Sequence, residues 1–108
     1  MTATRYHLSA RISSAAPDRV RAPLEAWLAG RGTVRPGADG WEVEADLEGP
    51  SARDLNRALL SELRRVEKRT RLRAEWRAAG WVERFFDYVP KGRRPESGPA
   101  PTRATGRG

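Results

Sequence analysis

Residues 81 to 94, WVERFFDYVPKGRR, place four aromatic side chains immediately before a basic segment. Aromatic rings beside cations are suited to single-stranded nucleic acid, because bases stack on the rings while phosphates pair with the cations. The same rings would form part of a hydrophobic core if they packed together. The secondary structure of this segment decides between the two.

A second group of basic side chains lies between residues 64 and 77. Together with the first cations after residue 90, it supplies the candidate polyanion-binding residues: Arg64, Arg65, Lys68, Arg69, Arg71, Arg73, Arg77, Lys91, Arg93 and Arg94. They would neutralise phosphates without reading a base sequence. A structural or compositional origin of these cations stays open, because the dipole at the end of a helix favours cations and a GC-rich genome favours arginine over lysine.

A third group of side chains could take part in acid–base chemistry: His7 and the alternating acids Glu42, Glu44 and Asp46. A histidine held by a carboxylate can act as a general base. However, no nucleophile motif, phosphate-binding glycine loop or metal-ligand spacing accompanies it. With no cysteine and one histidine, thiolate and histidine-rich metal sites are excluded. We therefore expect no enzymatic activity, no catalytic residues, no metal site and no cofactor.

Alternation of apolar and polar residues predicts four strands, at residues 4–13, 33–35, 41–49 and 71–77. Helical spacing predicts a first helix within residues 17–32, which either starts near Arg21 or is kinked at Pro23.

A second helix is predicted within residues 51–70, where Ser51 is suited to the N-cap and Asp54 stands at the capping-box position. The order strand, helix, strand, strand, helix, strand resembles the ferredoxin-like fold across residues 4–77. That resemblance implies an α+β domain with a four-stranded antiparallel sheet in the order 4-1-3-2 and two helices on one face.

One face of such a sheet is left open. Its outward positions on the two central strands are Arg5, His7, Ser9, Arg11, Glu42, Glu44 and Asp46. RNA-recognition domains with this order of elements stack bases on aromatic residues at such positions. Because none is aromatic here, that mode of binding is excluded. We expect Arg5 and Arg11 to pair with the acids across the strands.

Residues 81–89 fit a helix better than a strand, because their apolar side chains then fall within an arc of about 140°. On this interpretation Trp81, Phe85, Phe86 and Val89 form an apolar interaction face, packed against the sheet or a second subunit. The alternative is a hairpin strand after a loop at residues 78–80, which the strand-favouring aromatic residues support.

The expected organisation is one ferredoxin-like domain at residues 1–89 and a disordered, basic tail rich in proline and glycine at residues 90–108. The net charge of +7 is typical of a polyanion binder. No apolar run is long enough for a membrane span or a secretory signal, so we expect a cytoplasmic protein without a membrane partner.

The main functional hypothesis is a small, non-catalytic interaction module that forms a homodimer or docks on a protein partner. One alternative is an accessory protein that binds nucleic acid through nonspecific phosphate contacts. A second alternative is a small-molecule-sensing domain. The sequence specifies neither the partner nor a ligand.

Overall fold

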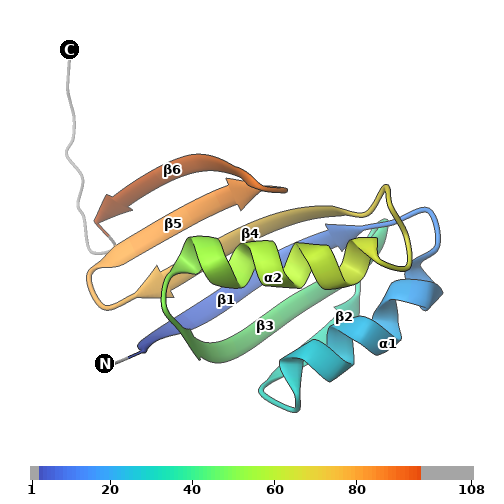
Figure 1. The fold of residues 1–108 in the computed structure, drawn as a ribbon, viewed down its shortest axis with the longest axis horizontal. Helices are drawn as coiled ribbons and strands as arrows, with labels where there is room; N and C mark the ends of the chain where they lie inside the picture. The colour runs from blue at the N-terminus through green and yellow to red at the C-terminus, as the bar shows by residue number, and fades with distance from the viewer. Residues whose placement is uncertain (1–2, 96–108) are drawn as a thin grey trace.

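A computed structural model describes the chain from residue 3 to residue 95. Its elements are β1 (Thr4–Ser13), α1 (Pro17–Leu28), β2 (Gly32–Pro36), β3 (Gly40–Gly49), α2 (Ala52–Arg64), β4 (Arg71–Ala78), β5 (Trp81–Phe86) and β6 (Val89–Pro95). The fold is α+β, with both helices on one face of a single sheet (Figure 1). The four strands predicted from alternation are confirmed to within one residue at each end.

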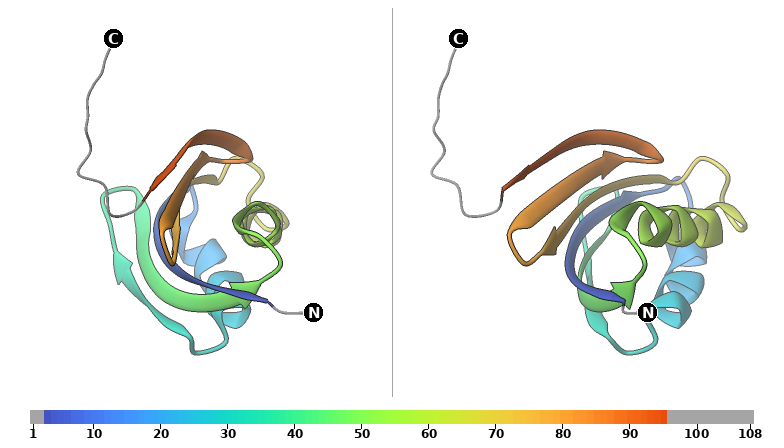
Figure 2. Two further views of the ribbon diagram at one scale, coloured as in Figure 1. Left: turned by 90° about the vertical axis from the view of Figure 1, so that its left-hand side faces the viewer. Right: turned by 60° about the vertical axis from the view of Figure 1, so that its left-hand side comes forward.

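The sheet has six strands in the order β2-β3-β1-β4-β5-β6, and every neighbouring pair is antiparallel. The prediction of four strands is therefore wrong in strand number. The physical reason is the edge of β4, which a four-stranded sheet would leave with unpaired backbone groups and which β5 covers. The sheet curls around the helices, and the hairpin β5–β6 extends beyond them (Figure 2).

The favoured helix over residues 81–89 is wrong, because this segment forms β5, a tight turn and the start of β6. The hairpin alternative is correct: Ala79 and Gly80 separate β4 from β5, and Gly80 adopts a φ of 85°. β6 also takes in residues 90–95 of the segment predicted to be disordered, because these residues pair with β5. Residues 96–108 lie outside the described part of the chain.

Both helices begin at residues suited to a first turn. α1 starts at Pro17 and not near Arg21, and it continues through Pro23. A proline in the first turn costs little, since its missing N–H would have no partner within the helix. In α2 the predicted cap is confirmed: the Ser51 hydroxyl accepts a hydrogen bond from the Asp54 backbone N–H at 3.1 Å.

No helix of residues 3–95 is long and apolar enough to cross a membrane.

The core lies between the sheet and the two helices. Two polar side chains of residues 3–95 are buried, Thr70 and Asn56 of α2, and Asn56 links three elements. The Asn56 carbonyl oxygen accepts a hydrogen bond from the indole N–H of Trp76 at 3.1 Å, and its amide donates to the backbone oxygen of Asp87 at 2.6 Å. These contacts join α2 to β4 and to the turn between β5 and β6. Asn56 therefore helps to position the β5–β6 hairpin, the segment for which periodicity predicted a helix.

Candidate functional site

The open face of the sheet carries its side chains in rows that cross the strands. Three rows matter for the site: the Arg11 row (Arg11, Glu42, Arg73, Phe86), the Ser9 row (Ser9, Glu44, Glu75, Arg84) and the His7 row (His7, Asp46, Arg77, Val82). Members of a row face one another in register. Neighbouring rows are two residues apart along each strand, or about 6.6 Å.

Each acidic side chain that β3 places on this face has a basic partner. Glu48 pairs with Arg5 at 3.3 Å, and Glu42 pairs with Arg35 of β2 at 3.5 Å. The prediction that Arg5 and Arg11 pair with Glu42, Glu44 or Asp46 is wrong. Arg5 pairs with Glu48, which lies directly opposite it, and Glu42, which lies opposite Arg11, pairs with Arg35. The acidic half of the open face is therefore largely neutralised.

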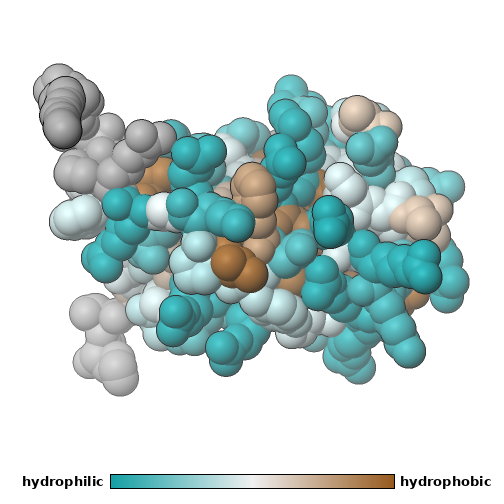
Figure 3. Space-filling view, turned by 90° about the horizontal axis from the view of Figure 1, so that it is seen from above, coloured by the Kyte–Doolittle hydropathy of each residue, from teal (hydrophilic) through white to brown (hydrophobic). Residues whose placement is uncertain are grey.

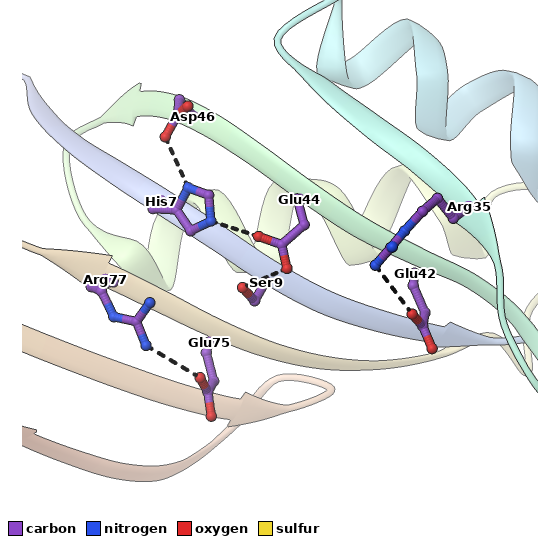
Figure 4. A network of polar contacts seen from close by, with 8 residues as sticks. All are labelled: His7, Ser9, Arg35, Glu42, Glu44, Asp46, Glu75 and Arg77. Atoms are coloured by element: carbon purple, nitrogen blue, oxygen red, sulfur yellow. Dashed lines mark hydrogen bonds and ion pairs between the residues drawn. The ribbon is translucent and has the colours of Figure 1, made fainter.

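His7 lies between the two remaining acids of β3 (Figure 4). Its Nε2 is 2.6 Å from Glu44 Oε1 and its Nδ1 is 3.0 Å from Asp46 Oδ1. Hydrogen bonds to Asp46 and then Glu44 raise the pKa of His7 above its usual value, and the bond from His7 lowers the pKa of Glu44. The pair is therefore stabilised in its charged form.

This network lacks the geometry of an activated nucleophile. Ser9 donates its hydroxyl proton to Glu44 Oε2 at 3.0 Å and does not contact His7, and both ring nitrogens of His7 already face carboxylates. Among residues 3–95, no group of histidine and acidic side chains is arranged to hold a metal ion.

The His7 network should make stability depend on pH in two windows. Because the pKa of His7 is raised by folding, its contribution is complete below the ordinary value of 6.5 and is lost as pH rises through the folded-state pKa. The pKa of Glu44 is lowered, so its contribution is present above 4.5 and is lost as pH falls through the folded-state pKa.

Urea unfolding between about pH 3 and pH 9 tests this expectation, since an ordinary histidine titrates near the middle of that range. His7 is the single histidine of the chain, so His7→Gln should remove the decline in the free energy of unfolding on the alkaline side. An equal alkaline decline in the variant would contradict the assignment.

At the other end of the open face, four cations line one groove, which we call the cationic groove. Arg11, Arg71, Arg73 and Lys91 surround a hollow of about 410 Å³ together with Phe86 and Val89. All four cations are exposed, and within residues 3–95 none forms an ion pair with a carboxylate.

Two carboxylates also line the cationic groove, and they leave its charge positive. Asp87 is 3.4 Å from the Arg64 guanidinium and accepts a hydrogen bond from the Leu72 backbone N–H at 2.9 Å. Asp39 is the other. Among the described residues, Asp39 and the four cations have no ion-pair partner, whereas Asp87 is paired with Arg64. The groove therefore holds four positive charges against the one unpaired carboxylate of Asp39.

The ring of Phe86 makes cation–π contacts with two of these cations. The Arg73 guanidinium carbon lies 4.5 Å from the ring centroid and the Lys91 ammonium 5.4 Å from it. β5 lies between β4 and β6, so the two cations approach the ring from neighbouring strands. Lys91 is the extra residue of a β-bulge in β6, since Arg84 pairs with Gly92 and Phe85 with Pro90. A bulge re-aims the side chain it adds.

The ten predicted polyanion-binding residues do not form one surface. Arg71, Arg73 and Lys91 line the cationic groove. Arg64 instead closes the end of α2, since its Nε donates to the Thr70 carbonyl oxygen at 2.8 Å and its guanidinium lies over the Tyr88 ring at 5.6 Å.

The remaining six predicted positions lie outside this groove. Arg65 pairs with Glu62 at 3.4 Å, while Lys68 and Arg69 are exposed between α2 and β4. Arg77 belongs to the His7 row, and Arg93 lies over the Trp81 ring at 4.8 Å. The side chain of Arg94 lies outside the described part of the chain.

The predicted apolar interaction face does not exist as one surface. Neighbouring strand residues point to opposite faces, so Phe85 is 3% exposed in the core while Phe86 is 38% exposed on the open face. Val89 accompanies Phe86 there, and Trp81 lies on the other face with Phe85. Seen from the β5–β6 side, apolar atoms form small areas among hydrophilic ones (Figure 3).

Sequence reasoning missed Arg11 as a site residue. The alternation of β1 correctly placed it on the open face, but Glu42 opposite it suggested an ion pair that Arg35 makes instead. No protein-family model, curated protein or solved structure matches the chain. Its function must therefore be argued from the geometry of the site itself.

Proposed function

We propose that this protein is a non-catalytic module that binds single-stranded nucleic acid through the cationic groove. The observation that carries the proposal is the distribution of unpaired charge on the open face. The acids of β3 have basic partners, whereas Arg11, Arg71, Arg73 and Lys91 gather in one groove without carboxylate partners among the described residues. Phosphates would supply the missing partners.

A single strand suits this surface better than a duplex. The cations lie on the open face of a sheet, beside a second hollow over the Ser9 row. A duplex would present its phosphates to the groove but would keep its bases stacked inside the helix. A single strand can place phosphates on the cations and turn its bases toward the sheet at the same time.

Two observations weigh against the homodimer or protein-docking hypothesis. The exposed rings of Trp81, Phe86 and Tyr88 each lie beside a cation, which interrupts the apolar surface that a stable protein interface would need. Both edge strands of the sheet also contain proline, Pro36 in β2 and Pro90 in β6, which hinders pairing with another strand.

The finer fold assignment is part of the same proposal. β1 to β4 with α1 and α2 have the order of elements of a ferredoxin-like unit, and β5–β6 would be an addition to the β4 edge. This addition supplies Phe86 and Lys91, so the groove would depend on it.

Fluorescence anisotropy with the full chain tests the proposal, using mixed-sequence single-stranded RNA and DNA and a matched duplex. Affinity for the single strands should exceed that for the duplex. It should fall roughly 20- to 50-fold between about 50 and 200 mM salt if three or four phosphates are contacted. No binding at about 50 mM salt, or binding indifferent to salt, would overturn the proposal.

A further inference from the structure

We infer that the hollow beside the cationic groove receives a base of the bound strand, and that its glutamates favour bases with an exocyclic amino group over uracil. This inference rests on the proposed function and adds a base preference to it. The hollow encloses about 300 Å³ and shares Arg11, Arg73 and Phe86 with the cationic groove. The two hollows are therefore neighbours, with the Arg11 row between them.

The position of the hollow follows from one short side chain. Ser9 stands in register between Glu44 on β3 and Glu75 on β4, and its hydroxymethyl group is much shorter than either neighbour. Space is left above it as a result. Ser9 lies one row, or about 6.6 Å, from Arg11. A nucleotide whose phosphate contacts Arg11 and Arg73 would thus direct its base over Ser9.

The walls of the hollow are rich in hydrogen-bond acceptors. Glu42, Glu44 and Glu75 line it, and each is already beside a basic side chain: Arg35 at 3.5 Å, His7 at 2.6 Å and Arg84 at 3.4 Å respectively. These partners offset the repulsion between the glutamates and phosphate. Because an ionised carboxylate has roughly four acceptor positions, it can accept a further hydrogen bond.

Acceptors of this kind discriminate among bases. Cytosine and adenine present an amino group, N4 or N6, that can donate to a glutamate. Uracil carries a carbonyl oxygen where cytosine carries the amino group, and this oxygen would meet a carboxylate without a proton between them. Four arginines also line the hollow. Arg35 pairs with Glu42 and Arg84 with Glu75, while the phosphate of the same nucleotide would engage Arg11 and Arg73. Amino-bearing bases are therefore favoured.

Anisotropy with oligocytidine and oligouridine of equal length tests the inference on the full chain. The wild-type protein should bind oligocytidine about fivefold more tightly, the lower end of the discrimination given by one base contact. The double variant Glu44→Gln, Glu75→Gln should lose most of this ratio, because each new amide can also donate to the uracil oxygen.

A matched control separates base preference from net charge. Glu25→Gln, Glu62→Gln removes the same two charges from the helices, away from the open face, and should leave the oligocytidine-to-oligouridine ratio unchanged. Equal affinity of the wild-type protein for both strands, or an unchanged ratio in the Glu44→Gln, Glu75→Gln protein, would overturn the base preference alone. Binding of neither strand at low salt would instead overturn the proposed function.

Discussion

Replacing Arg11, Arg73 and Lys91 together by glutamine is expected to weaken binding of a single-stranded oligonucleotide roughly 100-fold, taking about 1 kcal/mol for each exposed ion pair lost. These side chains are three of the four cations that line the groove. The slope of log affinity against log salt should also become shallower by about 2, since roughly 0.7 is lost per phosphate contact. Anisotropy at several salt concentrations measures both quantities.

A variant of equal charge provides the control. Arg19→Gln, Arg53→Gln, Arg57→Gln removes three exposed cations from α1 and α2, and it should change affinity much less than the groove variant does. Thermal unfolding should show that both triple variants remain folded, because all six arginine and lysine side chains are exposed. Similar losses in the two proteins would mean that binding follows total charge and not the groove.

Asn56→Ala is expected to lower the free energy of unfolding by about 3 kcal/mol, the largest effect on stability that we predict. Asn56 is 1% exposed and Trp76 is 0% exposed, so the indole N–H would lose its hydrogen-bond acceptor inside the core. The Asp87 backbone oxygen would lose its donor as well. Urea denaturation of the purified variant gives the value.

The neighbouring substitution Arg57→Ala serves as the comparison, since Arg57 is exposed on the same helix and should change stability by no more than about 0.5 kcal/mol. An Asn56→Ala protein as stable as the wild type would show that the polar contacts between α2, Trp76 and the β5–β6 turn contribute little. The hairpin would then be held chiefly by its pairing with β4.

Most of the fold could be predicted because the first four strands each bury one face. Leu8 and Val43 alternate with polar neighbours, and burial against helices on one side makes that alternation strict. β5 lies at the margin of the helices, so its two faces mix apolar and charged residues. Glu83 shares a face with Phe85, and Arg84 shares one with Phe86. Helical periodicity fitted this mixture better than alternation did.

The site could be predicted only in part, because it depends on strand register and on a bulge. Arg71 and Arg73 follow from the alternation of β4, and the sequence already placed Lys91 beside aromatic residues. The orientation of Lys91 depends on the bulge opposite Arg84 and Phe85, which local sequence does not reveal. Arg11 joins the site because β1 lies beside β4, a long-range pairing that brings Arg11 opposite Arg73.

The most direct test of the account is a map of where a short single-stranded oligonucleotide contacts the protein, measured by NMR chemical-shift changes of the backbone amides in the full chain. We predict the largest changes on the open face, at β4 around Arg71 and Arg73, in β1 at Arg11, and from Phe86 to Lys91. Changes confined to the outer surfaces of α1 and α2, with the cationic groove unaffected, would contradict the central claim.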